Sequence, residues 1–170
     1  MGAFNNLYKT LCLPLVLLTQ FVSETASQCS LTESFEKVSR STLKGVPGNP
    51  LFSDSGNTVT FNCLQRCRES GNCKGLLINY KLESCFSFDR DSSSVGVQLQ
   101  PSEEPVSYFE KICINAPQCG KGWILERVVG FEIEGYDDIV LSDVPSRIKC
   151  AEMCLRERGL MCRSAEYHMR

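Results

Sequence analysis

The residues of this chain that are best suited to chemistry are its cysteines, of which there are eleven among 170 residues. Four of them follow one another closely, at Cys63, Cys67, Cys73 and Cys85. Thiols grouped in this way form structural disulfides, bind a structural zinc ion or act as a redox pair. The spacing lacks the paired C-x2-C knuckles of zinc sites, and high cysteine density is typical of disulfide-stabilised secreted proteins. We therefore expect disulfides, with a four-cysteine zinc site as the alternative.

Other catalytic chemistry has little support in the sequence. The only histidine, His168, stands two residues before the last one, whereas a Ser–His–Asp or Cys–His site needs a histidine on a rigid element. Two pairs of adjacent acids, Glu103/Glu104 and Asp137/Asp138, fall in predicted loops and are expected to be solvated. We therefore predict that the protein is not an enzyme and holds no cofactor or metal ion.

The four cysteines are expected to lie on a short helix and a hairpin. Cys63 and Cys67 are four residues apart and share one face of a helix. Thr60 is the predicted N-cap, and Gly71 is expected to end the helix in a left-handed conformation. Two short β-compatible runs follow, at residues 76–80 and 85–88. The helix should therefore pack over a hairpin.

Residues 1–27 have the pattern of a secretory signal peptide. Lys9 supplies the basic region, residues 11–18 the apolar core, and residues 25–27 a small-residue cleavage site. The apolar run is shorter than a membrane span, and no later stretch is apolar enough to be one. The formal net charge of −2 comes without any basic block, which argues against nucleic acid as a partner. We expect a secreted, extracellular protein with no membrane span in this chain.

The cysteine pattern after the signal peptide repeats. The first four cysteines recur at an offset of about 90 residues, with Cys119, Cys150, Cys154 and Cys162 in the places of Cys29, Cys63, Cys67 and Cys73. Self-similarity at a fixed period indicates tandem modules. We predict a first domain at residues 28–113, a linker at 114–118 and a second domain at 119–170. A second helix should begin at Pro145 and Ser146 and stop at Gly159.

The second copy is incomplete in this sequence. The counterparts of Cys85 and Cys113 are missing, so we expect this copy to be truncated at its C-terminal side. Cys119 and Cys150 then have no expected partners. They would remain free, bond to each other, or link two chains as a disulfide-bonded dimer.

These features together resemble the PAN/Apple domain family. The first copy combines the C-x3-C helix and a C-x5-C link with a closing strand, Tyr108-Phe109-Glu110-Lys111-Ile112-Cys113. The second copy has Cys119-Gly120-Lys121-Gly122-Trp123, Gly130-Phe131, Gly135-Tyr136-Asp137-Asp138 and Cys162-Arg163-Ser164-Ala165-Glu166-Tyr167. This second set is similar to the tandem PAN modules of arthropod zona-pellucida-domain proteins of apical matrices. No zona pellucida domain is present in the sequence.

The resemblance implies an α+β fold of disulfide-rich modules, with one helix packed on a curved antiparallel sheet. It also implies the pairs Cys29–Cys113, Cys63–Cys85 and Cys67–Cys73, with Cys154–Cys162 as the counterpart of the last. The residues themselves leave the connectivity open, because six cysteines allow fifteen pairings.

The function that the resemblance implies is binding. A secreted adhesion protein would contact an extracellular protein or glycan ligand in an apical or cuticular matrix. The alternatives are a regulatory N-terminal part of a larger secreted serine-protease-like protein and a small secreted lectin. Trp123 and Tyr136 are candidate partner contacts, because aromatic residues are enriched where binding energy concentrates. The alternative for Trp123 is that it packs in a hydrophobic core and does not contact a partner.

Overall fold

The computed structural model describes residues 29, 32–53, 58–117, 124–135 and 137–168. We call residues 28–113 the N-terminal segment and residues 119–170 the C-terminal segment. The predicted signal peptide lies outside the described residues. Within the described ranges, neither helix has the length and apolar character needed to cross a membrane.

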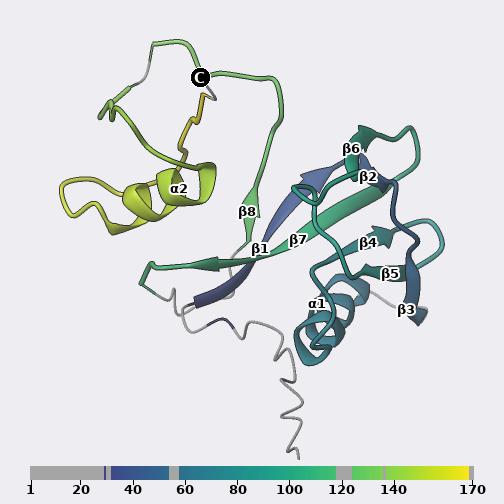
Figure 1. Cartoon of the computed structure of the whole chain (residues 1–170). Coiled ribbons are helices and arrows are strands. Elements are labelled where there is room, and N and C mark those ends of the chain that lie inside the picture. Colours follow the sequence, from purple (N-terminus) through teal and green to yellow (C-terminus); the bar gives the residue numbers. More distant parts are fainter. Residues whose placement is uncertain (1–28, 30–31, 54–57, 118–123, 136, 169–170) are drawn as a thin grey trace, which may run out of the picture.

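The fold is α+β, as predicted, and its main element is a six-stranded sheet with the order β3-β5-β4-β7-β1-β8 (Figure 1). Neighbouring strands are antiparallel except for β1 and β8, which are parallel. Its strands are β1 (Thr32–Ser39), β3 (Asn49–Ser53), β4 (Gly75–Asn79), β5 (Ser84–Phe88), β7 (Val106–Ile114) and β8 (Leu125–Glu126). The sheet is mixed because the C-terminal segment contributes β8.

Strands β1 and β7 form the centre of the sheet and pair over the whole of β1, from Thr32↔Ile114 to Ser39↔Ser107. Nearly all of β7 is buried on both faces. Successive side chains of a strand point to opposite faces, so Phe35 and Phe109 face one side while Glu36 and Tyr108 face the other. Both faces must therefore be covered by other elements.

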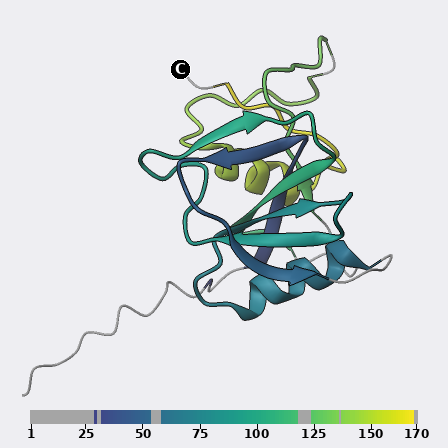
Figure 2. The same cartoon turned by 90° about the vertical axis from the view of Figure 1, so that its right-hand side faces the viewer.

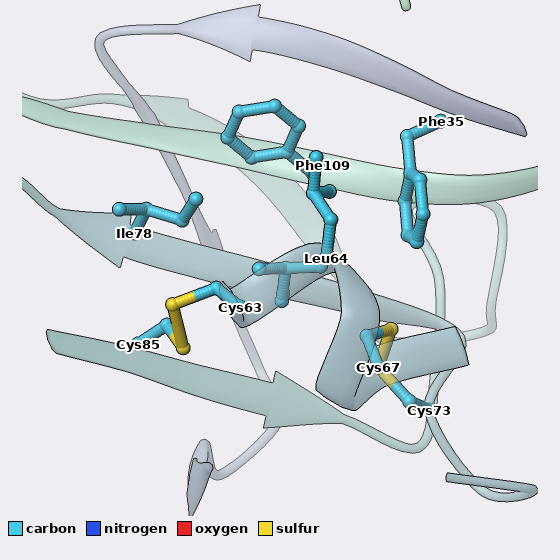
Figure 3. Close-up of a cluster of buried hydrophobic side chains, with 9 residues drawn as sticks. Phe35, Cys63, Leu64, Cys67, Cys73, Ile78, Cys85 and Phe109 are labelled. Carbon is cyan, nitrogen blue, oxygen red and sulfur yellow. A yellow bond between two sulfur atoms is a disulfide. The ribbon is translucent and has the colours of Figure 1, made fainter. Parts of the chain in front are cut away.

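Helix α1 (Val59–Glu69) covers the face that carries Phe35 and Phe109 (Figure 3). The side chains of Cys63, Leu64 and Cys67 point from the helix into this core. The predicted helix and hairpin are thus confirmed, and α1 packs on β3, β4 and β5.

Both predicted ends of α1 were wrong: the N-cap lies two residues before the predicted one, and the residue predicted to be left-handed at the other end is not. The N-cap is Thr58 rather than Thr60, and its side chain makes no capping hydrogen bond. At the other end, Ser70 is extended and its N–H bonds to the carbonyl oxygen of Arg66 at 3.1 Å. Gly71 is not left-handed. The extended residue turns the chain back toward Cys73, so no left-handed residue is needed there.

The opposite face of the sheet is covered in part by a two-stranded ribbon of β2 (Ser41–Lys44) and β6 (Gln98–Pro101). Leu43 and Val97 contribute to a second buried cluster with Val38, Phe88 and Tyr108 from the main sheet. The rings of Phe88 and Tyr108 meet edge to face, with centroids 6.2 Å apart. This second core gives the N-terminal segment three layers.

Helix α2 (Arg147–Arg156) approaches the sheet from a different side than α1, and Figure 2 shows it behind the strands. It begins one residue after the predicted start at Pro145 and Ser146, and Ser146 is its N-cap, accepting a hydrogen bond from the N–H of Lys149 at 3.1 Å. The helix ends at Arg156 instead of continuing to Gly159, and Glu157 is already extended.

The described part of the C-terminal segment forms no sheet of its own. Its one strand, β8, pairs with the outer edge of β1 in the register Glu36↔Leu125 and Lys37↔Glu126. The two segments are therefore joined through a shared sheet as well as through the chain.

Candidate functional site

Four disulfides join eight of the nine described cysteines. The pairs and their Cα–Cα distances are Cys29–Cys113 at 5.7 Å, Cys63–Cys85 at 6.2 Å, Cys67–Cys73 at 5.3 Å and Cys154–Cys162 at 5.4 Å. The four cysteines around α1 are buried and bonded in two separate pairs, which leaves no thiolate set for zinc (Figure 3). These bonds fix the helix to the hairpin and serve a structural role.

The remaining predicted site residues are only partly placed by the structure. Cys119, Trp123 and Tyr136 lie outside the described residues. Among the described residues, no disulfide partner reaches Cys150, whose thiol is free and lies 3.4 Å from the carbonyl oxygen of Glu166. Burial raises the pKa of the Cys150 thiol, which keeps it protonated and poorly nucleophilic at neutral pH.

An apolar groove of about 560 Å³ opens beside edge strand β3 and the hairpin of β4 and β5. It is lined by Pro50, Leu51, Phe52, Leu82, Ser84, Cys85 and Phe86. Leu82 stands at the hairpin turn and remains 64% exposed. Among the described residues that line the groove, Ser84 alone has a polar side chain. This surface suits an apolar ligand group, because exposed apolar surface next to a groove is typical of contact sites.

A second feature is a buried acidic pair on the sheet face opposite α1. Glu36 of β1 and Glu110 of β7 are directly opposite each other in the antiparallel register. Their side chains are only 8% and 7% exposed. Arg147 of α2 lies between them: its Nε is 3.0 Å from Glu36 Oε2, and its Nη2 is 2.5 Å from Glu110 Oε1.

Further groups complete this cluster. The Tyr108 hydroxyl donates to Glu110 Oε2 at 3.1 Å, and the backbone N–H of Ser92 donates to the same oxygen at 2.9 Å. Arg127, just after β8, places its Nη1 3.7 Å from Glu36 Oε2. Burial and the neighbouring Glu110 raise the pKa of Tyr108, so its hydroxyl stays a proton donor.

The guanidinium of Arg147 stays charged in this setting. Burial opposes its charge, but attraction to Glu36 and Glu110 outweighs that effect and raises the pKa of Arg147. The cluster is therefore an ion-pair network in which one guanidinium holds two carboxylates.

A third contact fastens the same helix to the end of β7. Glu152 accepts a hydrogen bond from the backbone N–H of Asn115 at 2.8 Å, and Lys149 Nζ lies 3.0 Å from its other oxygen. The hydrogen bond from Asn115, and then the contact with Lys149, lower the pKa of the Glu152 carboxyl. Helix α2 is thus attached to the N-terminal segment through Arg147, and to the residue that follows β7 through Glu152.

Sequence reasoning missed this cluster. Arg147 and Glu36 are 111 residues apart, and no spacing rule joins them. The one available clue was an acidic residue in each of two adjacent central strands, and its value depended on a register that the sequence does not reveal.

A comparison with protein-family models matches the chain to the PAN domain over residues 26–113 and again over residues 119–170. Among curated proteins, none matches the chain. PAN domains are modules that bind proteins or carbohydrates and are generally non-catalytic. The finer likeness to zona-pellucida-domain proteins of arthropods stays a prediction.

Proposed function

Because this chain belongs to the PAN domain family, we propose that it is a secreted, non-enzymatic binding protein whose tandem modules make contacts in an extracellular matrix. The two matched ranges support a tandem arrangement with a short linker at residues 114–118. Four disulfides support an oxidising compartment, since such bonds persist mainly in secreted proteins. The signal-like residues 1–27 support the same location.

The groove beside β3 is the observation from which we infer the class of ligand. Its lining is almost wholly apolar, whereas a carbohydrate site needs several directed hydrogen-bond donors and acceptors to replace those of water. Leu82 is exposed at the rim and would be buried by a partner. We infer that the ligand is a protein that inserts apolar side chains here.

The proposal that the protein is not an enzyme is supported by the bonding and pKa of its cysteines and by the position of its histidine. The cysteines of the N-terminal segment are bonded, and Cys150 has a raised pKa. His168 is exposed, with its Nε2 3.9 Å from Glu166 Oε2. These observations favour binding over turnover.

Site-specific crosslinking tests the proposal. A photo-reactive residue at position 82 should crosslink an extracellular matrix protein when the purified full chain is incubated with a matrix extract. The matched control places the same group at Val95, which is 95% exposed on a different loop. Leu82→Asp should abolish binding to the crosslinked protein, and a glycan array should stay negative. Glycan binding that survives Leu82→Asp, or equal crosslinking from positions 82 and 95, would contradict the assignment.

A further inference from the structure

The pair Glu36 and Glu110 is unfavourable by itself. Like charges directly opposite on neighbouring strands repel, and burial removes the water that would screen them. Both carboxylates nevertheless lie almost fully buried in the two central strands. Such an arrangement requires a cation between them.

The geometry selects a guanidinium over an ammonium group. A guanidinium presents several N–H donors in one plane, whereas an ammonium is a compact point charge. Here Nε reaches both oxygens of Glu36, at 3.2 and 3.0 Å, while Nη2 reaches Glu110. One planar group thus contacts two carboxylates that come from different strands.

The N-terminal segment holds Glu110 in place, while Arg127, just after β8, lies 3.7 Å from Glu36 Oε2. One oxygen of Glu110 is already held by the Tyr108 hydroxyl and the Ser92 N–H, which leaves its other oxygen for the incoming cation. Tyr108 packs in the second core, whose members all belong to the N-terminal segment, so the donor that holds Glu110 does not depend on α2 for its position. Preorganised groups bind a ligand with a smaller loss of entropy.

We propose that Glu36 and Glu110 form a guanidinium-binding site on the N-terminal segment, which Arg147 occupies within the same chain. Occupancy holds α2 on the sheet and so fixes the C-terminal segment relative to the N-terminal one. Without Arg147, the site becomes an acidic receptor that takes a guanidinium group from elsewhere. The ligand class is an alkylguanidinium, as in an arginine side chain.

Chemical rescue of the full chain tests this. Arg147→Ala removes the atoms that ethylguanidinium would replace. Hydrogen exchange of the α2 amides should become about tenfold faster in this variant, which corresponds to ~1.4 kcal/mol. Ethylguanidinium at millimolar concentration should restore most of the protection, while ethylammonium at the same concentration should not. Arg158→Ala, an exposed arginine just beyond α2, should leave exchange unchanged.

A second set of variants separates loss of the site from loss of folding. In Arg147→Ala with Glu36→Gln and Glu110→Gln, ethylguanidinium should have no effect, and the β1 and β7 amides should regain the protection that Arg147→Ala alone costs them. Unchanged α2 exchange in Arg147→Ala would overturn the proposal. So would equal rescue by the two cations, or rescue that persists in the triple variant.

Discussion

Gly45 and Gly96 meet so closely that a Cβ atom on Gly45 would lie 2.1 Å from the carbonyl oxygen of Gly96. Gly45 follows β2 and has a φ of +92°, in the region that favours glycine. Its contact closes the end of the β2–β6 ribbon, beside the buried Val97. The ribbon covers the second core, so the close contact between Gly45 and Gly96 affects how tightly the ribbon packs on that core.

Gly45→Ala should therefore destabilise the protein by about 2 kcal/mol, from the strained backbone and the displaced Gly96 carbonyl together. Gly71→Ala is the matched control: among the described residues, none comes within 4 Å of its added Cβ, and its φ is not positive. That variant should change the free energy of unfolding by less than about 0.5 kcal/mol. Denaturant unfolding measures both, and equal effects would contradict the assigned role of Gly45.

Removing Cys63–Cys85 should cost more stability than removing Cys67–Cys73. The two bonds close loops with sequence separations of 22 and 6. Because each bond reduces the entropy of the unfolded chain, the two bonds should stabilise the folded protein by about 3.4 and 2.3 kcal/mol, respectively. All four sulfurs are buried, so the paired double substitutions to alanine are matched in lost packing. In thermal unfolding, the Cys63→Ala/Cys85→Ala variant should have a lower Tm than the Cys67→Ala/Cys73→Ala variant. The reverse order of the two Tm values would argue against the loop-entropy explanation.

Tyr108→Phe should lower the free energy of unfolding by about 1–2 kcal/mol, because it removes the hydroxyl that donates to the buried Glu110 carboxylate. Tyr80→Phe is the control, since Tyr80 lies partly exposed after β4. The same change there should stay within about 0.5 kcal/mol. Chemical denaturation measures the free energy of unfolding of both variants. If Tyr108→Phe leaves this free energy unchanged, the buried Glu110 carboxylate does not depend on the Tyr108 hydroxyl.

The attachment of α2 through Glu152 should weaken in acid. Its pKa is lowered in the folded protein from an ordinary value of 4.5. A lowered folded pKa means that the contribution is present above about pH 4.5 and is lost as the pH falls through the lower folded value. The amide resonance of Asn115 should report this titration by NMR. Glu152→Gln keeps an acceptor oxygen and should remove the titration; a transition that persists in this variant would belong to another group.

The local parts of this fold could be predicted because short spacings determine them. Cysteines four apart on a helix, followed by two β-compatible runs, indicated a helix over a hairpin, and Pro145 with Ser146 indicated the start of the second helix. The ribbon of β2 and β6 was not predicted. Strand β3 begins at Asn49, inside the glycine- and proline-rich residues 45–50, although such a composition is typical of a loop.

The long-range parts could not be predicted for a physical reason. The network of Arg147 depends on the pairing of Glu36 with Glu110, which a shift of one residue in β1 would break. Similarly, β8 lies in the predicted second domain, and its parallel pairing with β1 joins residues that are about 90 positions apart. An exposed strand edge accepts any suitable partner, and the sequence does not reveal which one is nearest.

The Cys29–Cys113 bond also determines how this protein carries mechanical load. The bond joins Cys29, three residues before the start of β1, to Cys113 near the end of β7, so a covalent link bypasses the N-terminal segment. Once β8 and α2 have detached from the sheet, tension between the flanking parts of the chain passes through two sulfur atoms and leaves β1 unloaded. In single-molecule pulling, the oxidised segment should not lengthen, whereas reduction should release 84 residues of hidden length, roughly 280 Å. Under tension the N-terminal segment would act as a short inextensible link that keeps its groove intact.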